Sequence, residues 1–152
     1  MPLPPTERIW PTATGKAMFS VFKGVHENVV VEGEDVMRLV TLRSHDQYNT
    51  TIYAMDDRYR GVFGRRDVLF MNEQDMAAQG LEHGDRVDIH TALPGSALTL
   101  EDITVVAYGI APGTVGAYYP EANVLVPLNY LDEESGTPSY KSVPVRLTLR
   151  SR

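Results

Sequence analysis

Polar side chains that can bind a ligand are concentrated in Thr41–Tyr53, directly after a short apolar run that predicts a strand. Arg43 can hold a phosphate or a carboxylate through two parallel hydrogen bonds. Ser44, Gln47 and Asn49 add groups that donate or accept hydrogen bonds. This order is typical of a strand that carries a recognition loop at its carboxyl end, although an ordinary polar turn after a strand has the same composition.

Four arginines follow this loop closely, at positions 58, 60, 65 and 66. Residues 1–66 hold nine Lys and Arg against eight Asp and Glu, whereas residues 67–152 hold five against twelve. The half of the chain that contains the loop is therefore nearly neutral, with a local basic cluster. This cluster offers counter-charges to an anionic ligand, or it is a solvated charged loop.

Composition excludes several other kinds of site. The chain has 152 residues, a formal charge of -6 and no cysteine. The negative charge argues against general binding to nucleic acid or to a membrane surface. The lack of cysteine excludes disulfides, cysteine-ligated zinc and iron–sulfur clusters for this chain. The four histidines have no helix-face metal spacing, so we expect no metal site in this chain. We expect no catalytic group either. The protein is expected to be cytoplasmic.

Short strands must position the loop. Pro-rich residues 1–14 predict an extended lead-in or linker, and residues 15–152 predict one domain. Alternating or continuous apolar runs predict strands at 19–22, 29–31, 36–42, 67–71, 86–90, 98–108, 115–119, 124–128 and 140–150.

One short helix is predicted between the strands at 67–71 and 86–90. Asn72 is a good N-cap, and Glu73 and Asp75 lie in the first turn, where the helix dipole favours anions. Gly80 ends the helix, and Leu81 is placed to pack back across its end. The chain is therefore expected to be mainly β, with one or two short helices.

The recognition loop resembles a known segment. Its motif at 42–51, Leu-Arg-Ser-x-Asp-Gln-Tyr-Asn-Thr-Thr, is similar to the strand-to-loop segment that opens the C-terminal dinucleotide-binding domain of bis-molybdopterin oxidoreductases, in particular formate-dehydrogenase-like alpha subunits. In that family the loop holds molybdopterin guanine dinucleotide. The resemblance implies that Arg43, Ser44, Gln47 and Asn49 bind phosphate oxygens, ribose hydroxyls and a guanine edge.

Two further motifs resemble the same family, at residues 116–128 and 136–146. By resemblance they close over the dinucleotide, with an aromatic ring on the guanine, a carboxylate on its N–H groups and a lysine on phosphate. The residues implied are Tyr118 or Tyr119, Glu121, Asn123, Tyr140 and Lys141. Core packing is the alternative for the tyrosines, an Asx-turn for the asparagine, and an ordinary exposed side chain for the lysine.

The resemblance also implies the fold and the setting. The order strand, short helix, Gly-Leu-x-x-Gly-Asp and strand resembles the repeated unit of a double-psi β-barrel. Residues 12–19 are similar to the family's lead-in Thr-Pro-x-Gly-Lys-Ala-x-Phe, with Ala13 in place of proline. The chain is then a domain cut from a longer oxidoreductase, and the remaining domains of that alpha subunit are its partners. It would bind the nucleotide end of the cofactor, with molybdenum or tungsten held elsewhere, and would be inactive alone.

Two alternatives stay open from the sequence. The chain could be a free-standing double-psi barrel that acts as an interaction or adaptor module without cofactor. Gly95-Ser96 also resembles the self-cleaving Gly-Ser of pyruvoyl-dependent aspartate decarboxylase, another double-psi barrel, although the surrounding residues do not match.

Overall fold

The computed structural model describes residues 4–19, 33–132 and 135–151, and the chain forms two compact units, Met1–Val30 and Val31–Arg152. In the first unit, of which residues 4–19 are described, the 3-10 turn η1 (Pro4–Glu7) lies within the proline-rich lead-in. The domain boundary at residue 15 stays a prediction. The strand predicted at 29–31 and all but the first residue of the strand predicted at 19–22 lie outside the described residues.

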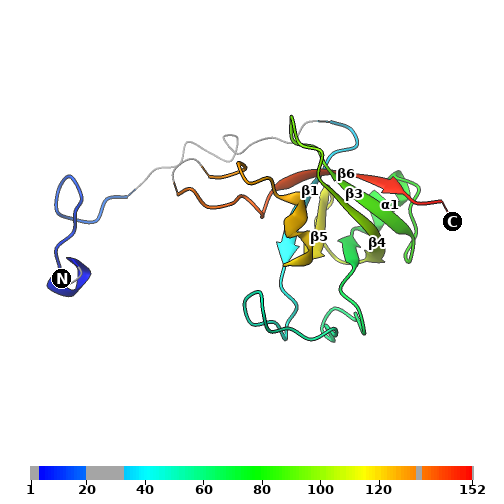
Figure 1. The fold of residues 1–152 in the computed structure, drawn as a ribbon, viewed down its shortest axis with the longest axis horizontal. Coiled ribbons are helices and arrows are strands. Elements are labelled where there is room, and N and C mark those ends of the chain that lie inside the picture. The colour runs from blue at the N-terminus through cyan, green and yellow to red at the C-terminus, as the bar shows by residue number, and fades with distance from the viewer. Residues whose placement is uncertain (1–3, 20–32, 133–134, 152) are drawn as a thin grey trace. The chain divides into compact units, whose positions relative to one another are not determined.

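The second unit is a closed barrel of six strands in the order β1-β5-β2-β4-β3-β6 (Figure 1). Strand β1 pairs in parallel with β5, and β2 pairs in parallel with β4, while the other four pairings are antiparallel. Closure gives each strand two neighbours and removes free sheet edges. The strands are β1 (Met37–Leu42), β2 (Val68–Met71), β3 (Arg86–Thr91), β4 (Thr99–Ala107), β5 (Thr114–Tyr118) and β6 (Val143–Leu149).

Alternating apolar side chains fill the barrel. Strand β3 alternates half-buried and buried residues along its whole length, which is the pattern of a strand with one face toward a core. Strand β2 is buried at all four positions, because its second face is covered by another apolar cluster around Phe70 and Tyr118. The main core includes Leu39, Leu69, Met71, Val87, Ile89, Val105, Val115, Val143 and Val145.

The short helix α1 (Glu73–Ala78) begins and ends where the sequence predicts. The Asn72 side chain accepts a hydrogen bond from the backbone N–H of Gln74 at 2.8 Å. At the other end Gly80 has a φ of 67°, and the N–H of Leu81 donates to the carbonyl of Met76 at 2.8 Å. This is a Schellman end, and Leu81 is buried as expected.

Two predicted strands differ from the structure. The strand predicted at 124–128 is wrong: residues 121–125 form a 3-10 helix, η3 (Glu121–Leu125). Its buried residues are Ala122 and Leu125, a spacing of three that suits a 3-10 turn and not a strand. Strand β6 begins at Val143 and not at residue 140, so Tyr140 and Lys141 lie in the turn before it.

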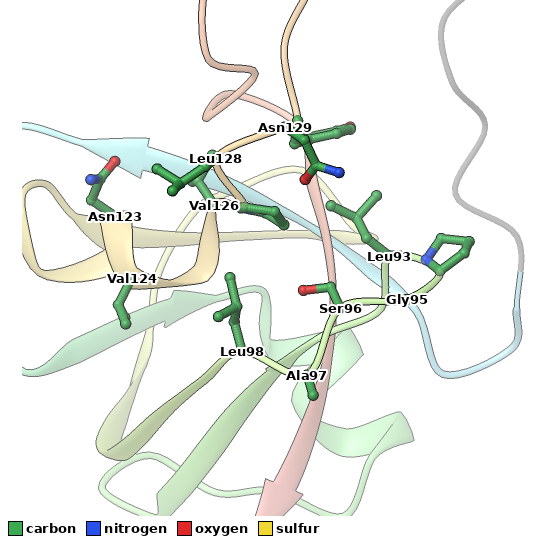
Figure 2. A pocket seen from close by; sticks show the side chains of 13 residues that line it. Leu93, Gly95, Ser96, Ala97, Leu98, Asn123, Val124, Val126, Leu128 and Asn129 are labelled. Atoms are coloured by element: carbon green, nitrogen blue, oxygen red, sulfur yellow. The ribbon is translucent and has the colours of Figure 1, made fainter.

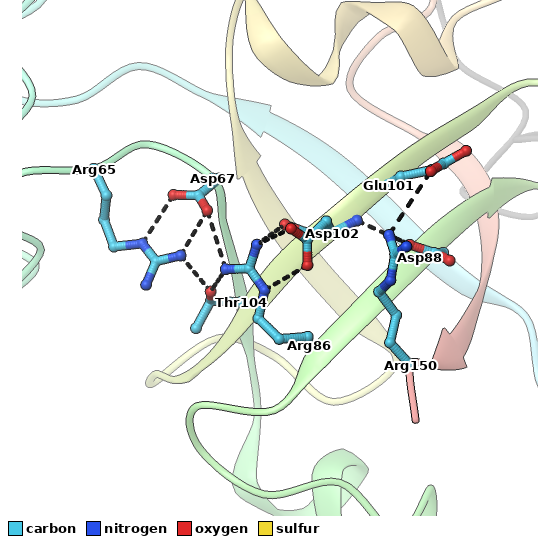
Figure 3. Close-up of polar contacts among 8 residues, drawn as sticks. All are labelled: Arg65, Asp67, Arg86, Asp88, Glu101, Asp102, Thr104 and Arg150. Carbon is cyan, nitrogen blue, oxygen red and sulfur yellow. Dashed lines mark hydrogen bonds and ion pairs between the residues drawn. The ribbon is translucent and has the colours of Figure 1, made fainter. Parts of the chain in front are cut away.

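A network of arginines and carboxylates covers one outer face of the barrel (Figure 3). Arg65 and Arg86 both bind Asp67, at 2.6 and 3.1 Å, and both donate to the hydroxyl of Thr104. The Arg65 hydrogen bonds are the largest cause that holds the pKa of Asp67 below its ordinary value. The network fastens the segment before β2 to the barrel wall and so fixes the backbone on both sides of Arg66.

Candidate functional site

A groove with a volume of about 720 Å³ lies where three separated segments meet. Because β1 and β5 are parallel, both strands reach the same end of the barrel, with Leu42 opposite Tyr118. Strand β6 is antiparallel to β1, so the turn before β6 lies at that end too. The lining residues are Thr41, Leu42, Arg43, Asn49, Thr50, Tyr119, Tyr140 and Lys141.

Two cations, Arg43 and Lys141, line this groove. Within the described part of the chain, neither has a carboxylate partner. The Lys141 ammonium donates a hydrogen bond to the carbonyl oxygen of Thr41 and lies 5.6 Å from the centre of the Tyr140 ring. Burial, and then the charge of Arg43, lower the pKa of Lys141. The groove therefore has positive charge that the described residues leave available to an anion.

An aromatic pair lies beside these cations. The rings of Tyr119 and Tyr140 stack with centroids 5.9 Å apart and planes inclined by 26°. Tyr118, in contrast, is only 1% exposed and donates from its hydroxyl to Asp57 at 2.9 Å. Burial, and then the hydrogen bond to Asp57, raise the pKa of Tyr118. Of the two tyrosines considered from the sequence, Tyr119 lines the groove and Tyr118 belongs to the core.

Arg66 connects the loop after β1 to the segment after β5, which carry part of the groove lining. It is 4% exposed, and its guanidinium donates to the Ser44 hydroxyl at 3.0 Å and to the Gln47 side-chain oxygen at 3.0 Å. It also donates to the Tyr119 carbonyl at 2.9 Å and to both carboxylate oxygens of Glu121, at 2.5 and 3.1 Å. One buried guanidinium thus binds the loop after β1 and the segment after β5 to each other.

Two tyrosine rings enclose the guanidinium of Arg66. The centre of the Tyr53 ring lies 4.2 Å from its central carbon, and that of Tyr118 lies 4.6 Å from it. Such contacts between a cation and an aromatic face are strongest where water is excluded. The arrangement gives each nitrogen of Arg66 an acceptor among the described residues and places a ring against the guanidinium on two sides, so Arg66 acts within the fold.

The residues predicted to bind cofactor therefore fall into different groups. Ser44, Gln47 and Glu121 form hydrogen bonds within the chain, and the Gln47 amide also donates to the Asn49 and Tyr119 carbonyls at 2.8 and 2.6 Å. They set the shape of the groove. Those that line the groove are Arg43, Asn49, Tyr119, Tyr140 and Lys141.

A second buried group, Asp57, lies after the recognition loop and binds His45 within it. It is 1% exposed and accepts hydrogen bonds from Arg60 at 2.5 Å, Tyr118 at 2.9 Å and His45 at 3.0 Å. Burial alone would raise the pKa of Asp57, but the hydrogen bonds from Arg60, His45 and Tyr118 outweigh it and keep the pKa below its ordinary value. The carboxylate is therefore charged in the folded protein at neutral pH.

The basic cluster noticed in the sequence is neutralised within the chain. Each of its four arginines forms an ion pair, Arg58 with Asp46, Arg60 with Asp57, Arg65 with Asp67 and Arg66 with Glu121. Only the first of these pairs is well exposed on both sides. The cluster is mainly a structural scaffold for the loop, and the available positive charge lies at Arg43 and Lys141 instead.

Asn123 lies apart from the groove. It is at the rim of a second cavity of about 620 Å³, formed by residues 93–98, 123–124 and 126–130 (Figure 2). Ser96 lines this cavity, and its hydroxyl oxygen is buried without a hydrogen-bond partner among the residues that the structure describes. The self-cleaving alternative at Gly95-Ser96 stays a prediction.

Comparison with known proteins identifies the domain. The family model described as "Molydopterin dinucleotide binding domain" matches residues 37–144. The chain belongs to the molybdopterin dinucleotide-binding domain family. All three segments of the groove lie within the matched range, so the family relationship covers the site described above.

Relatives of this molybdopterin dinucleotide-binding domain are longer proteins. It is 43% identical over 144 residues to Protein YdeP of Escherichia coli K12. The matched region covers 93% of this chain and 19% of that protein. It is 46% identical over 153 residues to an uncharacterized oxidoreductase of Mycobacterium tuberculosis H37Rv. That matched region covers 97% of this chain and 19% of that protein. The chain thus spans about a fifth of the length of these relatives.

A solved structure supports the fold. Acetylene hydratase from Pelobacter acetylenicus matches with a TM-score of 0.51 and 16% identity, over 73% of this chain and 18% of that protein. Together with the closed six-stranded topology, this likeness confirms the mainly β fold predicted from the sequence, a double-psi β-barrel with short helices.

The groove fits the group that the family name implies. A molybdopterin dinucleotide carries a diphosphate and a base. The groove offers two cations, which have no carboxylate partner among the described residues, beside a stacked aromatic pair. In the parts of this domain that the structure describes, no three His, Cys, Asp or Glu residues are grouped to hold a metal ion. No helix in the same parts is long and apolar enough to cross a membrane.

Two structurally important residues were not assigned a role from the sequence. Arg66 stood only as one member of a basic cluster, and Asp57 was not singled out. A usable signal exists for Arg66: it lies two residues before β2, whose four residues are all apolar and buried. A charged residue so close to a fully buried strand must find partners inside the protein. No comparable local pattern marks Asp57.

Proposed function

We propose that this chain binds the guanine nucleotide end of molybdopterin guanine dinucleotide within a larger, formate-dehydrogenase-like molybdenum or tungsten oxidoreductase. The observation that supports this most is the meeting of Arg43 and Lys141 in one groove, although they are almost a hundred residues apart in the chain. Neither has a carboxylate partner among the described residues, so both charges are available to a diphosphate.

Each lining residue has a role in this proposal. Arg43 and Lys141 hold the diphosphate, since a guanidinium binds phosphate oxygens in pairs and an ammonium adds a point charge. The stacked rings of Tyr119 and Tyr140 offer an aromatic surface to the base. The exposed Asn49 amide, which can donate and accept, addresses the ribose or the base edge. The bound cofactor would supply the redox chemistry through the metal on its dithiolenes.

We further propose that the other domains of the longer protein are the partners of this chain and that the chain alone has no activity. Large apolar side chains are exposed at Tyr48 and Ile52 in the recognition loop and at Met55, Tyr59 and Phe63 in the segment that follows it. A monomeric domain rarely exposes so many large apolar side chains within sixteen residues, and their exposure supports a neighbouring domain that covers them. A cytoplasmic location stays a prediction.

Titration calorimetry with guanosine diphosphate tests the proposal. We expect binding to the purified chain, and a loss of about tenfold to a hundredfold in affinity on Arg43→Met, because a hydrogen bond to a charged group contributes about 1.5–3 kcal/mol. Arg146→Met is the matched control, since Arg146 is an exposed arginine of β6 that does not line the groove. Absence of binding, or an equal loss in both variants, would contradict the proposal.

A further inference from the structure

Lys141 lines the groove, whereas Lys16, the other lysine that the structure describes, does not. The chain has only three lysines, Lys16, Lys23 and Lys141. The Lys141 ammonium lies at the wall of the groove, with the Thr41 carbonyl as its one hydrogen-bond partner among the described residues and the Tyr140 ring beside it. No carboxylate within the described part of the chain binds the ammonium, so no ion pair opposes the loss of its proton.

Two further features favour reaction of this amine with an anionic reagent. Partial burial and the charge of Arg43 lower the pKa of Lys141, which increases the fraction of free amine at a given pH. The groove is wide enough, at about 720 Å³, to admit a small molecule, and Arg43 lines it without a carboxylate partner in the described residues. An anion that enters is therefore held near a nucleophile.

We propose that Lys141 is a site of acylation by acyl phosphates, and that this modification reduces the affinity of the groove for phosphate-bearing ligands. The free amine nitrogen attacks the carbonyl carbon of the acyl phosphate and forms a C–N bond. The C–O bond to phosphate breaks, inorganic phosphate leaves with the electron pair, and water takes the proton lost by the amine. The product is a neutral amide.

Acylation changes the charge of the groove. An acylated Lys141 cannot contribute a cation, so the groove keeps only Arg43. The loss of one charged contact lowers affinity for a diphosphate by about tenfold or more. This second half rests on the proposed nucleotide function, whereas the acylation itself does not.

The test is incubation of the full chain with acetyl phosphate at pH 8, with acetylation at each lysine followed by peptide mass spectrometry. Lys16 is the internal control, because it is exposed and lies in the first unit of the chain. We expect Lys141 to react at least threefold faster than Lys16. High salt, or Arg43→Met, should reduce this preference, and with the uncharged reagent phenyl acetate it should be smaller. An equal or slower rate at Lys141 would overturn the proposal.

The proposed effect of acylation on ligand affinity is tested by a separate measurement. After treatment with acetyl phosphate, the affinity of the chain for guanosine diphosphate should fall about tenfold, while a Lys141→Arg variant treated in the same way should keep its affinity. An equal fall in both would overturn the assignment to Lys141. Rapid acetylation of Lys141 in a chain that binds no nucleotide at all would instead contradict the proposed function and leave the acylation site standing.

Discussion

Replacement of Arg66 by methionine is expected to lower the free energy of unfolding by about 3–5 kcal/mol, the usual cost of removing one partner from a buried charge network. The guanidinium donates to Ser44, Gln47, Glu121 and the Tyr119 carbonyl, so its loss leaves several partly buried acceptors without their donor. Methionine replaces much of the apolar volume but none of the donors.

Urea unfolding of Arg66→Met at pH 7 measures this loss. The matched control is Arg58→Met, because Arg58 belongs to the same basic cluster but forms an exposed pair with Asp46 at 3.6 Å. We expect the control to lie within about 0.5 kcal/mol of the natural chain. Equal losses in the two variants would show that Arg66 has no special structural role, contrary to the hydrogen bonds that the fold gives it.

Replacement of Asp57 by asparagine is expected to cost about 3 kcal/mol or more at pH 7. The change leaves the Arg60 guanidinium without its anion, and it places an amide N–H₂ among three donors, from Arg60, Tyr118 and His45. Asp46→Asn is the control on an exposed carboxylate and should change stability by less than about 0.5 kcal/mol.

The pH dependence of this loss identifies its electrostatic origin. The folded-state pKa of Asp57 lies below its ordinary value of 3.8, so its contribution is fully present above pH 3.8 and is lost as the pH falls through the folded value. The difference in unfolding free energy between the natural chain and Asp57→Asn should therefore narrow as the pH falls below 3.8. A difference that is constant from pH 7 to pH 2 would indicate a packing defect and not a lost ion pair.

Much of the barrel could be predicted because its signals are local. The caps of α1 at Asn72 and Gly80 use hydrogen bonds between residues close in the chain, and β3 shows a period of two in its own residues. The errors have local causes as well. Residues 124–128 are apolar enough for a strand, and only the buried spacing of Ala122 and Leu125 distinguishes the 3-10 helix.

The groove could be predicted only in part. Arg43, Tyr119 and Lys141 were identified from motifs, and the structure places them together at one end of the barrel. Asn123, in η3, lies at the rim of another cavity and does not line the groove. Residue types also do not reveal which polar groups are already bound within the protein. The internal roles of Gln47 and Glu121 depend on the approach of Arg66, which the antiparallel pairing of β2 with β5 brings to the end of β5.

The central claim is that three segments converge to bind the nucleotide end of one cofactor. A crystal structure of the chain with guanosine diphosphate tests it most directly. We expect the diphosphate between the side chains of Arg43 and Lys141, with the base against Tyr119 and Tyr140. A nucleotide found instead in the cavity lined by residues 93–98, 123–124 and 126–130, or a groove that stays empty at millimolar ligand, would contradict the account.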